Sequence, residues 1–459
     1  FRWFMLLISS CIFYMAFIPS YILILLITIV VDYLAAILIE NSEGTKKKTY
    51  LIISIISTCL ILFIFKYFNF FSSSLQFIVD LIGIEYKSKY LDLILPIGLS
   101  FHTFQSLSYV IEVYRGKQKA EKHFGIYSLY VMFYPQLVAG PIERPQNLLH
   151  QFREFHKFDY DRVTDGLKLM LFGMFKKVVI ADRLSVFVNE VYSSPTSFQG
   201  PALVMATIFF AFQIYYDFSG YSDIAIGSAK VMGFDLMKNF DRPYFSKSIS
   251  EFWTRWHISL STWFKDYLYI SLGGNRVSAF RWQFNLFFTF LISGLWHGAN
   301  WTYVIWGMLN GFYLVFSIWT FDIRNKIEKK LYISNNKIYK IIVTFSLICF
   351  SWIFFRAKNV SDAIYIVSHL FTGFDNLIDI SYIQKIISEQ GNIKTLEFII
   401  ACVLLIGMEI IHLIQRKYKI RDLISKNNIF IRWGIYYLLI LAIIFLGVFN
   451  KNDFIYFQF

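Results

Sequence analysis

The sequence predicts an all-α polytopic membrane protein, because three of its features fit a bilayer better than water. Of the 459 residues, 56% are hydrophobic and 20% aromatic, and the mean hydropathy is +0.51. Apolar runs recur at the length of about 17 to 25 residues that spans roughly 30 Å of hydrocarbon. The Lys and Arg residues fall in short clusters between these runs. We therefore expect membrane-spanning helices along most of the chain.

The apolar runs place the predicted spans in order. They cover residues 3–18, 21–39, 50–71, 91–111, 125–140, 166–191, 201–216, 283–301, 303–321, 341–355, 396–414 and 431–449. Residues 217–282 do not fit, because charged side chains interrupt an aromatic-rich stretch. These are Asp217, Asp223, Asp235, Asp241, Arg242, Glu251, Arg255, His257, Lys265 and Asp266. Polar backbone is tolerated at membrane depth only under a cover of protein or water, so we expect re-entrant or interfacial helices that wall an internal chamber.

Three basic loops set the predicted orientation, because cytoplasmic loops carry the excess of Lys and Arg. They contain Lys46, Lys47 and Lys48; Arg324, Lys326, Lys329, Lys330, Lys337 and Lys340; and Arg416, Lys417, Lys419, Arg421 and Lys426. Alternation of the last spans then puts the tail, residues 450–459, on the extracytoplasmic side.

No repeat or linker divides the chain, so we expect one domain over residues 1–459. Phe1 lies inside an apolar segment with no cleavable signal, so we expect the true N-terminus to precede this numbering.

The net charge of +13 does not indicate nucleic-acid binding, because the basic residues form no continuous face. The four cysteines all lie in apolar runs and none has a metal-ligand or redox spacing; they are Cys11, Cys59, Cys349 and Cys402. We interpret them as small core residues and predict no metal site.

His297 is the sharpest candidate for chemistry, because ionisable side chains within spans are costly and mark function by default. It lies late in an apolar run, where Gly294 and Gly298 leave room for a ligand or a second backbone. Burial favours the neutral imidazole, which can take a proton as a general base. A lone buried histidine is more often structural, so this hypothesis depends on the neighbouring motifs.

Residues 242–274 form a second cluster, rich in indoles and cations. Such side chains suit an interfacial helix, since both favour the headgroup level; they are Trp253, Trp256, Trp263, Arg255 and Lys265. The functional alternative is that His257, Arg255 and Lys265, with Trp256 beside them, bind the phosphates or thioester arm of an acyl donor at a cytoplasmic opening.

Two further stretches carry polar or helix-breaking residues. Asp217 and Asp223 are six residues apart, so on a continuous helix they face roughly opposite sides and do not form a paired acid and base. Structural polar contacts are at least as good an interpretation of these aspartates as a catalytic role. Residues 134–145 have Pro and Gly at spacings that break a helix, which predicts a re-entrant turn.

These four stretches together resemble the membrane-bound O-acyltransferase family, in the branch of the bacterial alginate O-acetylases and peptidoglycan O-acetyltransferase membrane subunits. The membrane component of teichoic acid D-alanylation is a more distant relative. The resemblance runs from about Pro96 to the end of the chain, with a signature region of residues 96–320. Its most specific part is Arg255-Trp-His-Ile-Ser-Leu-Ser-Thr-Trp-Phe-Lys-Asp-Tyr267 followed by Gly294-Leu-Trp-His-Gly-Ala-Asn-Trp301.

The resemblance implies a fold, a donor and a location. The fold is a ring of about 11 to 12 tilted transmembrane helices around a central tunnel, with re-entrant and interfacial helices. By this resemblance His297 is the catalytic histidine and His257 the second signature histidine, while Asp217, Asp223, Trp296 and Asn300 line the tunnel. The implied donor is acetyl-CoA, although a carrier-protein thioester serves the D-alanyl branch. The implied location is the bacterial cytoplasmic (inner) membrane, in contact with membrane lipid.

The last six residues, Phe454-Ile-Tyr-Phe-Gln-Phe459, resemble the terminal aromatic hexapeptide of this branch. Tyr456 is then an acyl acceptor: a phenol with a pKa of about 10 gives an ester between a thioester and an alkyl ester in reactivity. Without the resemblance, an aromatic anchor at the membrane surface is the better interpretation.

No Gly-x-Ser-x-Gly motif is present, so we expect an extracytoplasmic serine-esterase-like partner to pass the acyl group to a polysaccharide. Two alternatives are a transporter or flippase for a polysaccharide or lipid-linked sugar and a non-catalytic scaffold.

Overall fold

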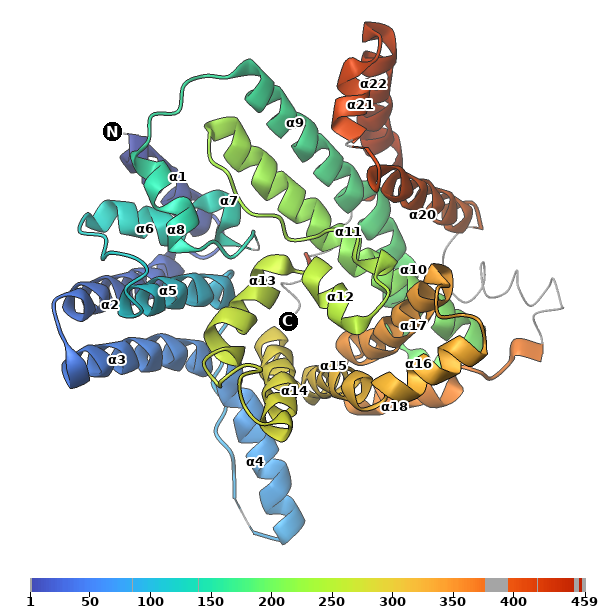
Figure 1. Cartoon of the computed structure of the whole chain (residues 1–459), viewed down its shortest axis with the longest axis horizontal. Helices are drawn as coiled ribbons and strands as arrows, with labels where there is room; N and C mark the ends of the chain where they lie inside the picture. Colours follow the sequence, from blue (N-terminus) through green and yellow to red (C-terminus); the bar gives the residue numbers. More distant parts are fainter. Residues whose placement is uncertain are drawn as a thin grey trace.

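The computed structural model describes residues 2–84, 86–138, 140–375, 395–418, 420–449 and 454–455. Over these ranges the chain forms helices and no strands, which confirms the all-α prediction (Figure 1). Tyr456 lies outside the described residues, as do most of the other residues of the predicted tail.

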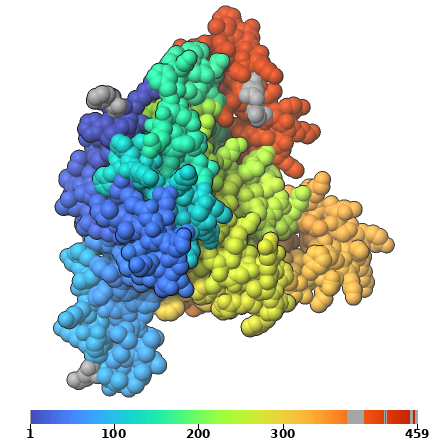
Figure 2. Space-filling view, turned by 60° about the vertical axis from the view of Figure 1, so that its left-hand side comes forward, coloured from blue at the N-terminus to red at the C-terminus, as the bar shows by residue number. Residues whose placement is uncertain are grey.

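The N-terminal part is a helical bundle joined to one projecting helix. Its helices are α1 (Arg2–Met15), α2 (Ile22–Glu40), α3 (Gly44–Leu62), α4 (Phe68–Ile82), α5 (Leu99–Tyr114), α6 (Phe124–Met132), α7 (Tyr134–Leu137) and α8 (Pro145–Leu148). Helices α2, α3 and α5 pack together, and a π-helical turn at Phe63–Tyr67 continues α3 into α4. Helix α4 extends away from the body of the molecule (Figure 2). The break between α6 and α7, with Pro135 at the start of α7, confirms the predicted interruption in residues 134–145.

A buried carboxyl group links the helices of this bundle. Asp32 on α2 accepts hydrogen bonds from Ser54 and Thr58 on α3 and from Ser106 on α5. All four side chains are fully buried. These contacts satisfy a polar group that would otherwise be costly in an apolar interior.

The centre of the molecule is a pair of closely packed long helices. Helix α9 (Tyr160–Met174) continues through a π-helical segment, Phe175–Ala181, into α10 (Asp182–Ser193) and packs along α11 (Gly200–Met232). Glycines allow the close approach: a Cβ added to Gly173 would lie 2.5 Å from the carbonyl oxygen of Gly220. The sequence prediction that the helix ends near residue 216 is wrong, because α11 continues through both aspartates to Met232. Partners on neighbouring helices satisfy the charges that suggested a break.

The rest of the chain packs around α9, α10 and α11. It comprises α12 (Ile249–Arg255), α13 (Ile258–Trp263), a π-helical segment (Phe264–Tyr269), α14 (Ala279–His297), α15 (Trp301–Trp319), α16 (Phe321–Lys330), α17 (Lys337–Arg356), α18 (Val360–His369), α20 (Thr395–Gln415), α21 (Ile420–Lys426) and α22 (Ile429–Leu446). Residues 249–269 form short helical elements, and their predicted re-entrant or interfacial placement stays a prediction. The C-terminal helices α20 to α22 lie beside α9, near the π-helical segment that follows it (Figure 1).

Seven helical stretches in the described residues are long and apolar enough to cross a membrane. They are Pro19–Glu40, Gly44–Ile82, Gly200–Met232, Trp301–Trp319, Lys337–Arg356, Leu396–Gln415 and Ile429–Leu446. Each overlaps a predicted span. The other predicted spans overlap helices, such as α5 and α14, that are too short or too polar to meet the same length and hydropathy criteria. The protein is a multi-pass membrane protein.

Candidate active site

His297 is the last residue of α14 and is only 5% exposed. The chain becomes extended at Gly298, and α15 starts three residues later, so the histidine lies at the turn between two antiparallel helices. The two helices cross closely because a Cβ on Gly294 would lie 2.3 Å from the carbonyl oxygen of Tyr303. The imidazole packs edge-on against the rings of Trp306, at 5.0 Å, and Phe355, at 5.2 Å.

His257 is 1% exposed and has a left-handed backbone, with φ of +42°. This conformation is costly for a residue other than glycine and persists only where neighbours enforce it. The enforcing contacts come from Asn239: its carbonyl oxygen accepts from the backbone N–H of Ile258 at 2.9 Å, and its side chain accepts from Ser259 Oγ at 2.6 Å. The strained residue therefore points a histidine into the interior at the start of α13.

The indole of Trp296 connects the two histidines. Its ring centroid lies 4.9 Å from that of His297 and 6.5 Å from that of His257. Phe101 on α5 packs against both His257, at 6.2 Å, and Trp296, at 5.6 Å. The structure thus brings the two predicted histidines, 40 positions apart in the sequence, into one aromatic chamber.

A small cavity of about 80 Å³ adjoins this chamber, lined in part by His297, Trp296, Phe101 and Lys66. Trp296 lines this cavity, and its predicted role in lining a tunnel stays a prediction. Asn300 has a different contact: its side chain caps α15 by accepting from the Thr302 N–H at 3.0 Å and donates to the Lys358 carbonyl oxygen at 3.0 Å.

Asp217 binds the C-terminal segment to the core. It is 3% exposed on α11, and one of its oxygens accepts from the backbone N–H of Ile455 at 2.8 Å. Its other oxygen pairs with Lys177 at 2.7 Å, and Lys177 also pairs with Asp182 at 2.8 Å. Phe454 stacks on Tyr221 at 4.8 Å. The described part of the tail is thus buried against α11, one residue before Tyr456.

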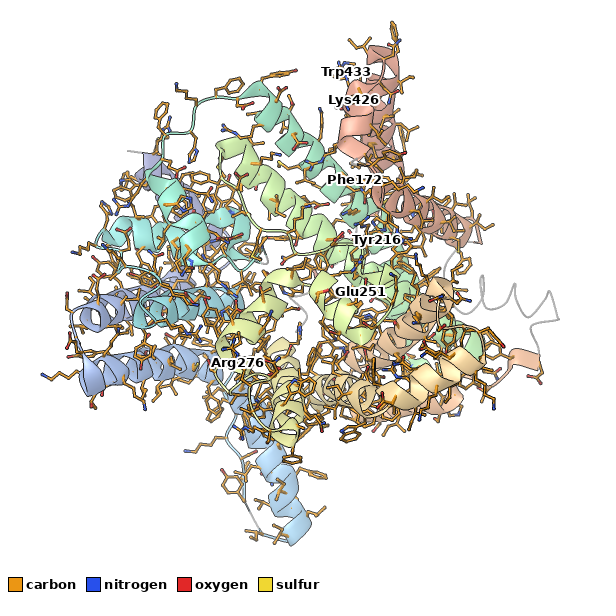
Figure 3. All side chains as sticks on the ribbon, viewed as in Figure 1. Phe172, Tyr216, Glu251, Arg276, Lys426 and Trp433 are labelled. Carbon is orange, nitrogen blue, oxygen red and sulfur yellow. The ribbon has the colours of Figure 1, made fainter. Side chains whose placement is uncertain are left out.

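A second, larger cavity of about 530 Å³ lies between α9, α11, residues 235–242 and the C-terminal helices. Figure 3 labels Phe172 on its wall, with Lys426 and Trp433 on the adjoining C-terminal helices. Six cationic side chains and three carboxylates line it: Lys168, Lys176, Lys230, Lys238, Arg242 and Arg421, and Asp223, Asp235 and Asp241. Asp223, paired with Lys176 at 2.7 Å, faces this cavity, whereas Asp217 faces the tail. The two aspartates do face different sides of one helix.

This cavity reaches close to the histidine chamber. Asn239 and Phe240 form part of its wall, and the Phe240 ring lies 6.5 Å from that of His257. The predicted orientation places Arg421 and the rest of the loop after α20 in the cytoplasm. Phe240 therefore belongs both to the wall of this basic cavity and to the aromatic surroundings of His257.

Comparison with known proteins identifies the family. A family model described as MBOAT, the membrane-bound O-acyltransferase family, matches residues 122–357, which contain both histidines. The chain belongs to the membrane-bound O-acyltransferase family. It is therefore an acyltransferase, as the sequence motifs predict.

Three relatives show the range of this family. A probable alginate O-acetylase of Pseudomonas aeruginosa is 40% identical over 367 residues, which cover 78% of this chain and 68% of the relative. A peptidoglycan O-acetyltransferase of Helicobacter pylori is 34% identical over 416 residues, 84% of this chain and 76% of the relative. A teichoic acid D-alanyltransferase of Bacillus subtilis is 26% identical over 287 residues, 58% of this chain and 70% of the relative. Each match leaves part of the relative's own length uncovered.

The residues predicted to hold the donor lie apart from both cavities of this acyltransferase. Arg255 pairs with Glu251 at 2.7 Å, and Lys265 is exposed. Trp256 is 1% exposed and packs against Phe252 and Trp352. Trp256 and Trp263 are core residues, so the interfacial-helix interpretation is wrong for these two indoles. The donor role of the three residues stays a prediction.

Sequence reasoning missed three charged residues of the site: Lys66, Lys177 and Asp182. All three lie inside predicted spans, at 50–71 and 166–191. The available signal was their charge in an apolar run, the same signal that singled out His297. Within the described residues, no group of His, Cys, Asp and Glu side chains has the arrangement of a metal site.

Proposed function

We propose that this acyltransferase moves an acetyl group from acetyl-CoA, or a similar cytoplasmic thioester, through the bacterial inner membrane for O-acetylation of a cell-envelope or exported polysaccharide. The named activities of the alginate and peptidoglycan relatives support an acetyl group and a polymer acceptor. The observation that carries the proposal is the placing of His257 and His297 around Trp296, between a basic cavity and the buried C-terminal segment.

The donor enters through the 530 Å³ cavity in this proposal. Its lining carries three more positive than negative side chains, six against three, which suits the phosphates of a thioester donor. The thioester arm then extends past Phe240 toward the histidines. Arg255, Lys265 and Trp256, which the motif predicts as donor contacts, lie outside this cavity, so this route does not use them.

Acyl transfer proceeds through the tail in the proposed mechanism. His297 takes the phenolic proton of Tyr456 as the phenol oxygen attacks the thioester carbonyl, and the C–S bond breaks. The departing thiolate takes up the proton, which leaves an aryl ester on Tyr456 and a free thiol. A serine on an extracytoplasmic esterase-like partner then attacks the aryl ester and releases the phenol. The anchor at Asp217 supports this mechanism because it holds Ile455, the residue before Tyr456, inside the protein.

The test is transfer of radiolabelled acetyl from acetyl-CoA to the purified protein in detergent, with mass spectrometry of the C-terminal peptide. We expect label on Tyr456 in the wild type and none in His297→Ala or Tyr456→Phe. His150→Ala and Tyr332→Phe are matched controls, since both side chains are exposed far from the chamber. Label that persists in both active-site variants would refute the mechanism. An unlabelled wild type would refute the proposed function with acetyl-CoA as the donor.

A further inference from the structure

The C-terminal end of α14 needs hydrogen-bond donors from elsewhere, because its last backbone carbonyl groups have no intrahelical partner. Inside a membrane protein such groups must find partners within the protein, and each one left unpaired is costly. The extended backbone at Gly298 ends the helix abruptly. A Cβ at Gly298 would lie 2.2 Å from the ring of Tyr303, so there is no room for a side chain at this position.

The missing partners come from the π-helical turn between α3 and α4. Lys66 Nζ donates to the carbonyl oxygens of Trp296, at 2.7 Å, and of His297 itself, at 3.1 Å. The hydroxyl of Tyr67 donates to the carbonyl oxygen of Leu295 at 3.1 Å. Two consecutive side chains, 230 positions away in the sequence, thus cap the last turn of α14 from outside the helix.

The charge of Lys66 suits this position. A helix C-terminus carries a partial negative charge, which offsets part of the free energy that burial of the Lys66 ammonium group costs. Lys66 pairs with no carboxylate among the described residues. Its ammonium group instead lies 5.8 Å from the Trp296 ring centroid and lines the small cavity that also contains His297. Lys66 therefore contacts both the backbone of His297 and the indole of Trp296.

We infer that Lys66 is a positioning residue for His297: it fixes the last turn of α14, and with it the imidazole, through two hydrogen bonds to the helix end. This inference rests on the proposed function, which makes His297 the base. Lys66 acts through the helix backbone and leaves donor binding in the cytoplasmic cavity unchanged. Its removal therefore lowers kcat and leaves the KM for the donor unchanged.

The experiment measures the single-turnover rate of acetyl transfer from acetyl-CoA to Tyr456 of the whole chain at varied donor concentration. Its maximum rate constant is called kcat here, and the half-saturating donor concentration is called KM. Lys66→Met keeps the length and removes all donors, Lys66→Gln keeps one donor group, and Lys66→Arg keeps charge and donors. Lys48→Met makes the same chemical change at an exposed position on α3. Since a displacement of about 1 Å can cost 100-fold in rate, we expect kcat to fall about 10- to 100-fold in Lys66→Met. Donor KM should stay within twofold, with a smaller loss in Lys66→Gln and recovery in Lys66→Arg.

Wild-type kcat in folded Lys66→Met would overturn the inference, as would an equal loss in Lys66→Arg. If Lys66→Met fails to give a single gel-filtration peak, the folded Lys66→Gln variant decides: reduced kcat at unchanged KM supports positioning, and wild-type kcat overturns it. A wild-type protein that transfers no acetyl group would instead refute the proposed function. The two failures are therefore distinguishable.

Discussion

Replacement of Asp217 by Asn tests how the C-terminal segment is held. The carboxylate accepts from the Ile455 N–H at 2.8 Å and from Lys177 at 2.7 Å. An Asn amide has one oxygen and one NH2 group, so it can accept from Ile455 or from Lys177 but faces the other with a donor. The shape of the side chain is kept, and only the acceptor and the charge are lost.

The expected magnitude follows from the bond that is lost. A hydrogen bond to a charged group contributes about 1.5–3 kcal/mol. At about 1.4 kcal/mol per factor of ten, the ratio of bound to released tail should fall roughly 10- to 150-fold. Lys177 retains Asp182, at 2.8 Å, as its partner, which limits the damage to the surrounding helices.

Hydrogen–deuterium exchange of the peptide that contains Ile455 measures this ratio directly, because the amide is protected by its bond to Asp217. We expect exchange to accelerate by the same factor in Asp217→Asn, and acetyl transfer to fall in parallel. Asp223→Asn is the matched control for exchange, since this aspartate is on the same helix but pairs with Lys176. Unchanged exchange in Asp217→Asn, or equal acceleration in both variants, would refute the anchoring role.

Three further predictions concern stability, measured by thermal unfolding in detergent. Asp32→Asn should be tolerated because an amide oxygen still accepts from the neighbouring hydroxyl groups, whereas Asp32→Leu leaves them without an acceptor and should cost about 1–3 kcal/mol. Gly294→Ala should cost about 1–3 kcal/mol, because the new Cβ would lie 2.3 Å from the Tyr303 carbonyl oxygen; equal stability would contradict the close crossing. Burial alone would raise the pKa of Asp165, but its hydrogen bond to Lys230 and the nearby charge of Arg421 bring it below its usual value. The unfolded chain then binds the proton more readily than the folded protein. Asp165→Asn should therefore be less stable than the wild type at pH 7, and this difference should vanish as the pH falls below about 4.

Membrane insertion and the two histidines could be predicted from the sequence for different reasons. Apolar runs predict spans because the bilayer imposes their length, and the described residues contain seven such stretches. His257 and His297 stand out because their surrounding motifs are specific. The extent of α11 could not be predicted in the same way: Asp217 and Asp223 suggested a break, and only the lysines of the adjacent helix, invisible as neighbours in the sequence, make a continuous helix possible.

Lys66 and Lys177, which the sequence analysis missed, both lie in π-helical segments. Lys66 lies in the π-helical segment Phe63–Tyr67, and Lys177 lies in the π-helical segment Phe175–Ala181. A π-turn inserts a residue into the helical repeat, so the faces counted at 3.6 residues per turn shift at that point. A lysine that the regular period assigns to one side of the helix can then face another, where it meets the end of α14 or the carboxylate of Asp217. Both π-segments therefore bring a cation to a backbone or side chain that positions the candidate chemistry. The charge of each lysine in an apolar run marks it as a candidate, but the regular helical period does not predict what it contacts.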